Sequence, residues 1–133
     1  EKMSKSYGNT IELQLSGKPL KKTVMSIKTD STPVEEPKDP ETCNVFALYS
    51  LFATEEERAA LTTKYRSGGM GYGEAKKLLL EKIETHFEPY RKKREDWSKN
   101  RDYVREVLCD GATRARGVAQ ATLDEAKKAA GLL

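Results

Sequence analysis

The chain has 133 residues, a formal net charge of +3 and a mean hydropathy of −0.74, with 37% hydrophobic and 34% charged residues. This composition leaves room for one compact domain with a modest core, and it excludes a membrane span of roughly twenty consecutive apolar residues. We therefore expect a soluble, cytoplasmic protein with no membrane partner. The first residue is not Met and no signal-like apolar stretch follows it, which indicates a fragment of a longer protein.

Two cysteines and a single histidine limit the possible chemistry. Cys43 and Cys109 lie far apart in the sequence, so neither a zinc site nor a redox pair is expected. His86 stands alone in a predicted helix, which argues against a Ser-His-Asp or Cys-His catalytic unit and favours a structural or solvent-facing role. We predict two free thiols and no bound metal.

Charge is unevenly distributed along the chain. Residues 2–28 carry six lysines against one glutamate, whereas residues 29–62 carry two basic and eight acidic residues. Residues 91–105 are basic again, with seven basic and three acidic side chains. A polyanion such as RNA could contact both basic segments, but the solvated faces of surface helices commonly carry similar charge. Charge alone leaves both interpretations open.

The beginning of the chain predicts a loop followed by two short helices. Small polar residues predict the loop over residues 1–9. Asn9 and Glu12 have the spacing of a capping box, so a short helix is expected that Gly17 ends. Pro19 fits the first turn of the second helix. The apolar residues on one face of this second helix are Leu20, Val24 and Ile27.

An acidic segment with three prolines, over residues 29–41, predicts an ordered loop or linker before the next helices. Asp39 followed by Pro40 predicts a helix start at that point. Thr54 and Glu57 form another predicted capping box, and the helix after it is expected to end at a pair of glycines. The buried stripes of these two helices comprise Val45, Leu48, Tyr49 and Phe52 in the first, and Leu61 and Tyr65 in the second.

The strongest helical pattern follows Gly73. Its apolar residues are Ala75, Leu79, Ile83, Phe87 and Tyr90, at near-helical spacing. Pro89 has no backbone N–H and predicts a kink in this helix. Ser98 or Asn100 is expected to cap a further helix, and a last helix with small inward-facing residues is expected to start near Asp110. No strand pattern or internal repeat is present, so the predicted fold class is all-α.

One motif predicts chemistry, namely Lys2-Met3-Ser4-Lys5-Ser6. Two ammonium groups on a flexible loop, with hydroxyls beside them, suit a polyphosphate ligand. When a carboxylate attacks the α-phosphate of ATP, negative charge collects on the departing pyrophosphate, and a lysine that closes over it in the transition state lowers the barrier. The loop is therefore a candidate phosphate-binding site.

These five residues match, without a substitution, the KMSKS signature of class I aminoacyl-tRNA synthetases. Other segments resemble the bacterial-type tryptophanyl-tRNA synthetases, namely residues 24–31 (VMSIKTDS), 44–49 (NVFALY), 71–77 (GYGEAKK) and Pro89-Tyr90. The resemblance covers essentially the whole chain. It implies that Lys2 and Lys5 are the catalytic residues and that all five residues of the motif bind the ATP phosphates. It implies the C-terminal part of such an enzyme, in which the KMSKS loop precedes a helical bundle that corresponds to the anticodon-binding domain, without the Rossmann-like catalytic domain.

The resemblance also implies substrates, partners and domain limits. The parent enzyme would activate tryptophan with ATP and transfer it to tRNA(Trp). Mg²⁺ would accompany ATP without binding to this fragment's own residues, and a homodimer would form through the missing domain. Because no His-x-Gly-His type motif and no βαβ pattern are present, the isolated fragment is expected to be inactive. The expected parts are the KMSKS loop (1–9), connecting helices (10–28), a linker loop (29–41) and the helical domain (42–133).

The predicted tRNA contacts rest on charge. The candidates are Arg91, Lys92, Arg94, Arg101 and Arg105. Trp97 and Tyr103 could stack on unpaired bases, but their helical spacing favours positions in the core. Two alternatives are a non-catalytic helical RNA-binding module and a tyrosyl-tRNA synthetase, which shares the general layout but matches the sequence less well.

Overall fold

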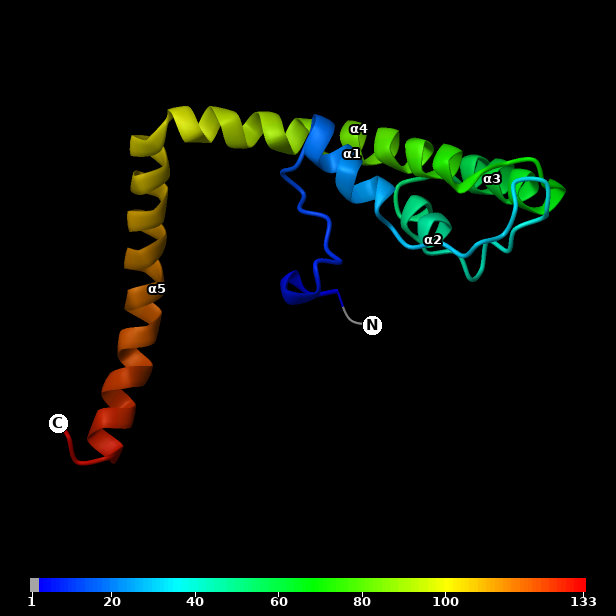
Figure 1. Cartoon of the computed structure of the whole chain (residues 1–133). Helices are drawn as coiled ribbons and strands as arrows, with labels where there is room; N and C mark the ends of the chain where they lie inside the picture. The colour runs from blue at the N-terminus through cyan, green and yellow to red at the C-terminus, as the bar shows by residue number, and fades with distance from the viewer. Residues whose placement is uncertain (1–2) are drawn as a thin grey trace. The chain divides into compact units, whose positions relative to one another are not determined.

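The structure is a computed structural model that describes residues 3–133. These residues form helices and no strand, so the all-α prediction is confirmed (Figure 1). The elements are a 3-10 helix η1 (Lys5–Tyr7) and the α-helices α1 (Gly17–Met25), α2 (Asn44–Ser50), α3 (Glu55–Ser67), α4 (Tyr72–Lys99) and α5 (Arg101–Ala129). The chain forms two compact units, Glu1–Arg91 and Lys92–Leu133, which are described separately. The four-part division expected from the sequence stays a prediction.

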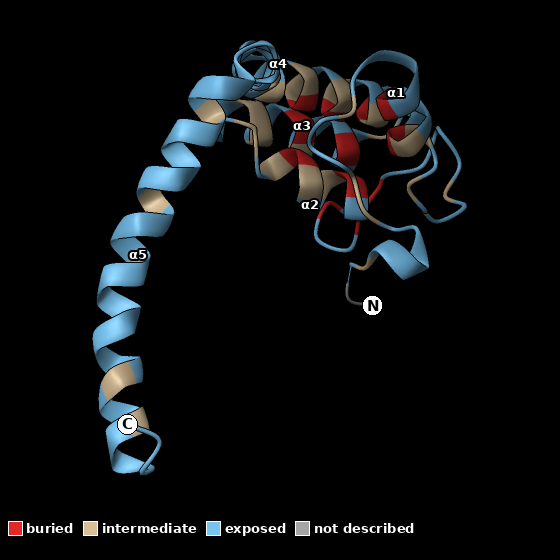
Figure 2. Ribbon diagram, turned by 90° about the vertical axis from the view of Figure 1, so that its left-hand side faces the viewer, coloured by how far each residue is buried: buried red, intermediate tan, exposed pale blue. Residues whose placement is uncertain are grey.

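The core of the first unit lies between α1, α2, α3 and the N-terminal part of α4 (Figure 2). Each helix supplies buried apolar residues four positions apart, a spacing that places them on one face of the helix. They are Leu20 and Val24 in α1, Val45 and Tyr49 in α2, Leu61 and Tyr65 in α3, and Ala75, Leu79 and Ile83 in α4. The predicted stripes are therefore confirmed, except that Leu48, Phe52 and Phe87 are only half-buried and Tyr90 is exposed.

Several predicted helix ends are present. The Thr54 hydroxyl accepts a hydrogen bond from the Glu57 backbone N–H at 3.3 Å, and the Thr54 N–H donates to the Glu57 carboxylate at 2.9 Å, which completes the capping box of α3. Gly68 follows the end of α3 as predicted, with φ of 73° and ψ of 179°, a glycine conformation outside the left-handed helical region. Asn100 caps α5 by accepting from the Tyr103 backbone N–H at 3.3 Å. These helix ends could be predicted from the sequence because residues close together in the chain determine them.

The helix predicted to start at Asn9 is wrong. The Asn9 side chain accepts a hydrogen bond from the Ser4 backbone N–H at 2.7 Å, so its oxygen stabilises the preceding turn instead of capping a helix. The chain from Asn9 to Ser16 has no regular structure apart from a turn in which the Leu15 N–H donates to the Glu12 carbonyl at 3.0 Å. The second predicted helix is present as α1, with Pro19 in its first turn.

Two other predicted helix starts are wrong. The Asp39 carboxylate accepts hydrogen bonds from the Glu41 N–H at 3.0 Å and the Thr42 hydroxyl at 3.1 Å. This arrangement forms a turn, and α2 starts later, at Asn44. No helix starts at Asp110 because α5 runs through this residue and the glycine after it without a break. One internal glycine costs about 1 kcal/mol relative to alanine, which good helix formers on both sides can offset.

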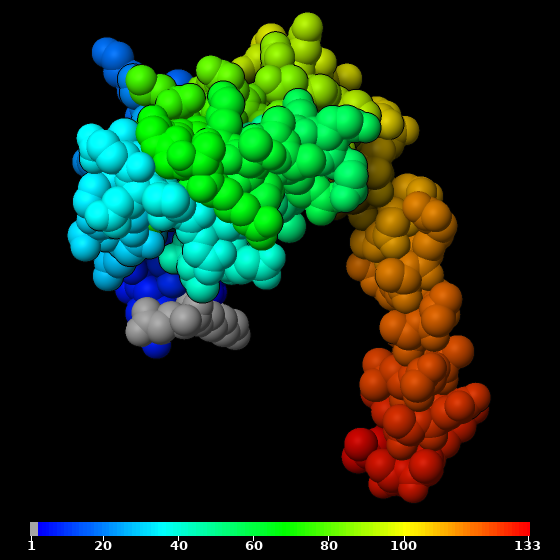
Figure 3. Space-filling model, turned by 90° about the vertical axis from the view of Figure 1, so that its right-hand side faces the viewer, coloured from blue at the N-terminus to red at the C-terminus, as the bar shows by residue number. Residues whose placement is uncertain are grey.

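Lys38 organises the acidic loop at residues 29–41. It is only 4% exposed, and its ammonium donates to the carbonyls of Pro33 at 2.7 Å and Glu36 at 3.2 Å. The ammonium also lies 5.3 Å from the centre of the Tyr72 ring. The Lys38 backbone N–H donates to the Tyr65 carbonyl at 2.7 Å, which ties the loop to α3. The loop therefore packs closely against the end of α3 and the start of α4 (Figure 3).

A second contact ties the beginning of this loop to α4. The Tyr72 hydroxyl donates to both carboxylate oxygens of Asp30, at 2.8 and 2.9 Å. Hydrogen bonds from Thr32 and from Tyr72 lower the pKa of Asp30 below its usual value. Burial, together with the hydrogen bond to Asp30, raises the pKa of Tyr72 to about 12. Asp30 is thus held as a carboxylate that orders the loop.

The second unit contains the end of α4 and all of α5. Helix α4 continues through Pro89 to Lys99, and α5 buries none of its residues (Figure 2). Trp97 and Tyr103 are 55% and 52% exposed, so the prediction that they lie in the core is wrong for this chain. The small residues of α5 are exposed as well, because the described chain supplies no second helix to cover them. None of the described helices is long and apolar enough to cross a membrane.

Candidate functional site

Residues 3–9 fold into a compact turn. The Ser4 hydroxyl accepts a hydrogen bond from the Ser6 backbone N–H at 3.2 Å and lies 2.6 Å from the Ser6 hydroxyl. The Tyr7 N–H donates to the Ser4 carbonyl at 3.1 Å, which closes the 3-10 helix η1. Gly8 ends η1 with φ of 63°, a left-handed conformation that favours glycine. The two serines therefore determine the shape of the turn.

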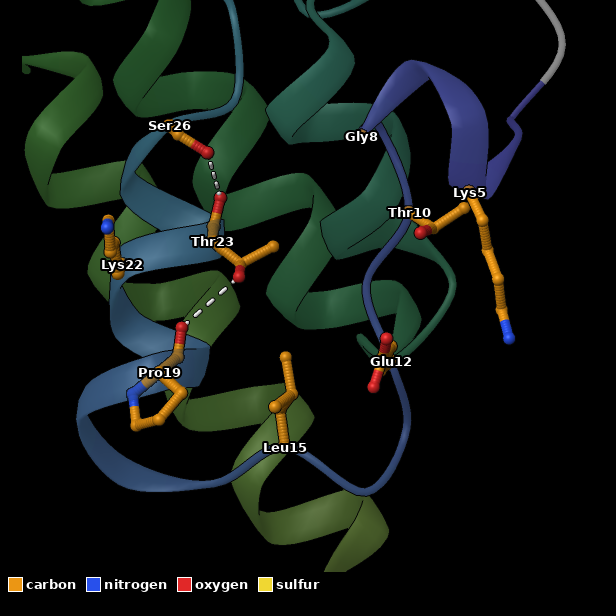
Figure 4. Close-up of a pocket in the computed structure, with 9 residues that line it drawn as sticks. All are labelled: Lys5, Gly8, Thr10, Glu12, Leu15, Pro19, Lys22, Thr23 and Ser26. Atoms are coloured by element: carbon orange, nitrogen blue, oxygen red, sulfur yellow. Dashed lines mark hydrogen bonds between the residues drawn. The ribbon is translucent and has the colours of Figure 1, made fainter.

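Lys5 is the first residue of η1 and is exposed. Its side chain extends away from α1, with the ammonium at its free end (Figure 4). Lys2, the other predicted catalytic lysine, lies outside the described residues, and Met3 is exposed. Ser4 and Ser6 lie on either side of Lys5 in the turn, and each hydroxyl has acceptor capacity beyond the bonds described. An ordered turn of this kind can present one cation to an anionic ligand.

A hollow of about 500 Å³ lies between this turn and α1 (Figure 4). Its lining residues are Lys5, Gly8, Thr10, Glu12, Leu15, Pro19, Lys22, Thr23 and Ser26. The Thr23 hydroxyl donates to the Pro19 carbonyl at 3.2 Å, and the Ser26 hydroxyl donates to the Thr23 carbonyl at 2.8 Å. Because these two hydroxyl protons are used inside α1, we assign no ligand to the hollow itself.

The predicted RNA contacts fall into two groups. The Arg91 guanidinium is half-buried, and its Nη1 donates to the Glu84 carbonyl at 3.2 Å, so it takes part in the structure of α4. The other four candidates, Lys92, Arg94, Arg101 and Arg105, are exposed and belong to the second unit. Trp97 and Tyr103 are exposed in the same unit.

The sequence analysis missed an aromatic cluster at the end of the first unit. His86 lies 5.2 Å from the Phe52 ring and 6.1 Å from the Tyr90 ring, stacked on the latter at 29°. Phe87 packs against both Phe52 and Tyr90. The spacing of His86 and Tyr90, four residues apart on α4, was the signal available in the sequence. His86 is exposed, in agreement with the predicted solvent-facing role.

Neither cysteine belongs to a metal-binding group. Cys43 is buried with its thiol 3.5 Å from the Tyr65 hydroxyl, and Cys109 is exposed. Burial, together with this contact, raises the pKa of Tyr65 above its usual value. Over residues 3–133, no three His, Cys, Asp or Glu side chains are grouped so that they could hold a metal ion.

Comparison with known proteins identifies the family. The family described as tRNA synthetases class I (W and Y) matches residues 1–88, which include the turn, α1, α2, α3 and most of the buried core. The chain therefore belongs to the class I tRNA synthetases of the tryptophan and tyrosine group.

Its relatives within this group are tryptophan–tRNA ligases. That of Rhodopirellula baltica is 48% identical over 99% of this chain, and that of Fusobacterium nucleatum is 46% identical over the whole chain. The crystal structure of tryptophanyl-tRNA synthetase from Campylobacter jejuni, complexed with ADP and tryptophan, matches 98% of this chain at 42% identity, with a TM-score of 0.89. The chain spans 41% of the length of each of these three proteins. The resemblance to bacterial tryptophanyl-tRNA synthetases is confirmed.

Proposed function

We propose that this chain is part of a longer tryptophan–tRNA ligase, called the full-length protein below, which activates tryptophan with ATP and transfers it to tRNA(Trp). In this proposal, residues 2–6 bind the ATP phosphates, and the helices of the second unit contact the tRNA anticodon. The observation that carries the proposal is the ordered turn that presents Lys5. It lies in a chain of which 99% aligns with a tryptophan–tRNA ligase at 48% identity.

The proposed chemistry assigns a role to each residue of the turn. The tryptophan carboxylate attacks the α-phosphorus of ATP, and the bond to the bridging oxygen of pyrophosphate breaks. The ammonium groups of Lys2 and Lys5 then compensate the negative charge that grows on the leaving oxygens. Ser4 and Ser6 stabilise the turn on either side of Lys5, since the Ser4 hydroxyl accepts a hydrogen bond from the Ser6 backbone N–H and lies next to the Ser6 hydroxyl. Mg²⁺ accompanies ATP, but the described residues supply no group of metal ligands, so we assign none to this chain.

Pyrophosphate exchange into ATP tests the proposal directly. The full-length protein is expected to catalyse exchange with tryptophan and not with tyrosine. The isolated chain of 133 residues is expected to show no exchange above background, because the family's amino-acid pocket belongs to a Rossmann-like domain with β-strands, and residues 3–133 form no strand. Exchange with tyrosine in place of tryptophan, or no exchange by the full-length protein, would exclude the proposed activity.

We further propose that the exposed cations Lys92, Arg94, Arg101 and Arg105 contact the tRNA backbone. Replacing Arg101 by glutamine in the full-length protein is expected to weaken tRNA(Trp) binding a few-fold and to reduce the slope of log K against log salt by about 0.7 to 0.9. Arg114→Gln is the matched control, since Arg114 lies on the same helix but pairs with Asp110 at 3.1 Å. Filter binding at several salt concentrations measures the affinity and the salt slope of each variant. Equal slopes for the two variants would contradict the assignment of Arg101.

A further inference from the structure

Helix α1, which follows the candidate ATP loop, is joined to α4 by hydrogen bonds at both of its ends. At its start, the Gly17 N–H donates to the Glu84 carboxylate at 3.2 Å. At its end, the Lys76 ammonium donates to the Met25 carbonyl at 3.1 Å and the Ile27 carbonyl at 2.6 Å. Because the start of α1 meets the later residue of α4, the two helices lie side by side and antiparallel (Figure 1).

The spacing of the two contacts matches the length of α1. Met25 lies eight positions after Gly17, and Glu84 lies eight positions after Lys76. At a rise of about 1.5 Å per residue, each interval spans about 12 Å along its helix axis. Residues of α4 at these positions can therefore contact both ends of α1 at once.

Glu84 takes the place of an ordinary N-terminal cap of α1, and Lys76 adds to the C-terminal cap that Ser26 already provides. Ser16, the N-cap of α1, makes no side-chain capping hydrogen bond, and the first turn of α1 contains no acidic residue. Glu84 supplies a negative charge at the positive end of the helix dipole, and Lys76 supplies a positive charge at its negative end. A helix of nine residues is marginal in isolation, so α1 depends on such external contacts.

The turn that carries Lys5 is connected to α1 through residues 9–16, and the two line the same hollow. Leu15, in the segment that connects the turn to α1, packs against the core and faces Thr23 of α1 across the hollow that Lys5 also lines (Figure 4). The fully buried Leu20 and Val24 hold α1 in the core, and the hydrogen bonds at its two ends add directional contacts with α4. Hydrogen bonds depend on distance and angle, so those of Lys76 and Glu84 favour one position of α1 along and about its axis.

We propose that Lys76 and Glu84 are positioning residues for the ATP-phosphate loop. They hold α1, and through it the turn that carries Lys5, at the place where the Lys5 ammonium meets the leaving pyrophosphate. This inference rests on the proposed function, because it assigns to α4 a part in adenylate formation. Lys76 and Glu84 act through α1 and do not contact the substrate.

The test measures pyrophosphate exchange and thermal unfolding of the full-length protein with Lys76→Met. The expected result is a fall in kcat of about 10- to 100-fold with a nearly unchanged KM for tryptophan, because a displacement of a catalytic group by about 1 Å has an effect of this size. Lys76→Arg, which keeps donors at the same end of α1, is expected to restore most of the rate. If Lys76→Met does not fold at the assay temperature, Glu84→Gln carries the test, with a smaller expected fall in kcat at unchanged unfolding temperature.

Lys82→Met is the matched control. Lys82 also lies on α4 and its ammonium contacts both carboxylate oxygens of Glu57 at 2.6 Å, but this pair joins α4 to α3 and not to α1. We expect Lys82→Met to lower the unfolding temperature at least as much as Lys76→Met while leaving kcat unchanged. An unchanged kcat in Lys76→Met, or equal falls in both variants, would overturn the inference. A Lys5→Ala variant with unchanged exchange would instead refute the proposed role of the loop, so the two failures are distinguishable.

Discussion

Replacing Lys5 by alanine in the full-length protein is expected to lower kcat for tryptophan-dependent pyrophosphate exchange by about 10²- to 10³-fold, the size typical of removing one group that stabilises transition-state charge. The KM for ATP is expected to change much less. In the proposed function, Lys5 contacts phosphate oxygens whose charge increases as pyrophosphate leaves, so this interaction would be stronger in the transition state than in the bound substrate. Steady-state exchange at varied ATP concentration separates the two constants.

Lys21→Ala is the control for this prediction. Lys21 is exposed on α1 and belongs to the same basic segment, so its removal changes the local charge by the same amount as removal of Lys5. It is expected to leave kcat unchanged. A loss confined to the KM for ATP in Lys5→Ala would indicate uniform binding instead of catalysis. No loss at all would favour the alternative in which this chain is an RNA-binding module and the loop has no chemical role.

The parts of the fold that the sequence predicts correctly depend on residues close together in the chain. The capping box of Thr54 and Glu57 and the two glycines after α3 act within three or four residues, so a short window contains all the information. The buried residues of α1 to α4 follow from spacing along one helix for the same reason. The KMSKS motif likewise lies within five consecutive residues, but the phosphate-binding role that it predicts for Lys5 stays a prediction.

Two of the incorrect predictions concern polar side chains that can accept hydrogen bonds from either of two local partners. Asn9 and Asp39 could each cap a following helix, but each accepts hydrogen bonds in a turn instead. Composition does not distinguish these outcomes, because the same oxygen serves either purpose. Trp97 and Tyr103 were placed in the core from their spacing, but spacing identifies a face of a helix and not what covers it.

The contacts that position the candidate site could not be predicted from the sequence. Glu84 and Gly17 are 67 residues apart, and Lys76 lies 51 residues from Met25. No local pattern distinguishes Lys76 and Glu84 from the other charged residues of α4, and they become meaningful only once α1 lies against that helix. The sequence therefore predicts which group performs the chemistry, whereas the structure is needed to find what holds that group in place.

The junction of α3 and the acidic loop leads to the largest expected effect on stability. Gly68 has φ of 73° and ψ of 179°, a conformation that other residues rarely adopt, and a Cβ at this position would overlap the Glu35 backbone carbonyl. Gly68→Ala is expected to lower the free energy of unfolding of the chain by about 2 to 6 kcal/mol. This range combines about 1 to 3 kcal/mol for the backbone conformation with about 1 to 3 kcal/mol for displacing the loop. Urea unfolding followed by circular dichroism measures the change.

Gly69→Ala separates these two contributions. Gly69 also has a positive φ, 81°, but a Cβ added there would meet no atom within 4 Å. Its substitution therefore carries conformational strain alone, about 1 to 2 kcal/mol. Because the Gly69 N–H donates to the Val34 carbonyl at 2.8 Å in the same loop, both variants strain the backbone of one region, and the Gly68 variant adds the collision with Glu35. Equal losses in the two variants would mean that the loop moves aside at no cost, and that its contacts with the end of α3 contribute little to stability.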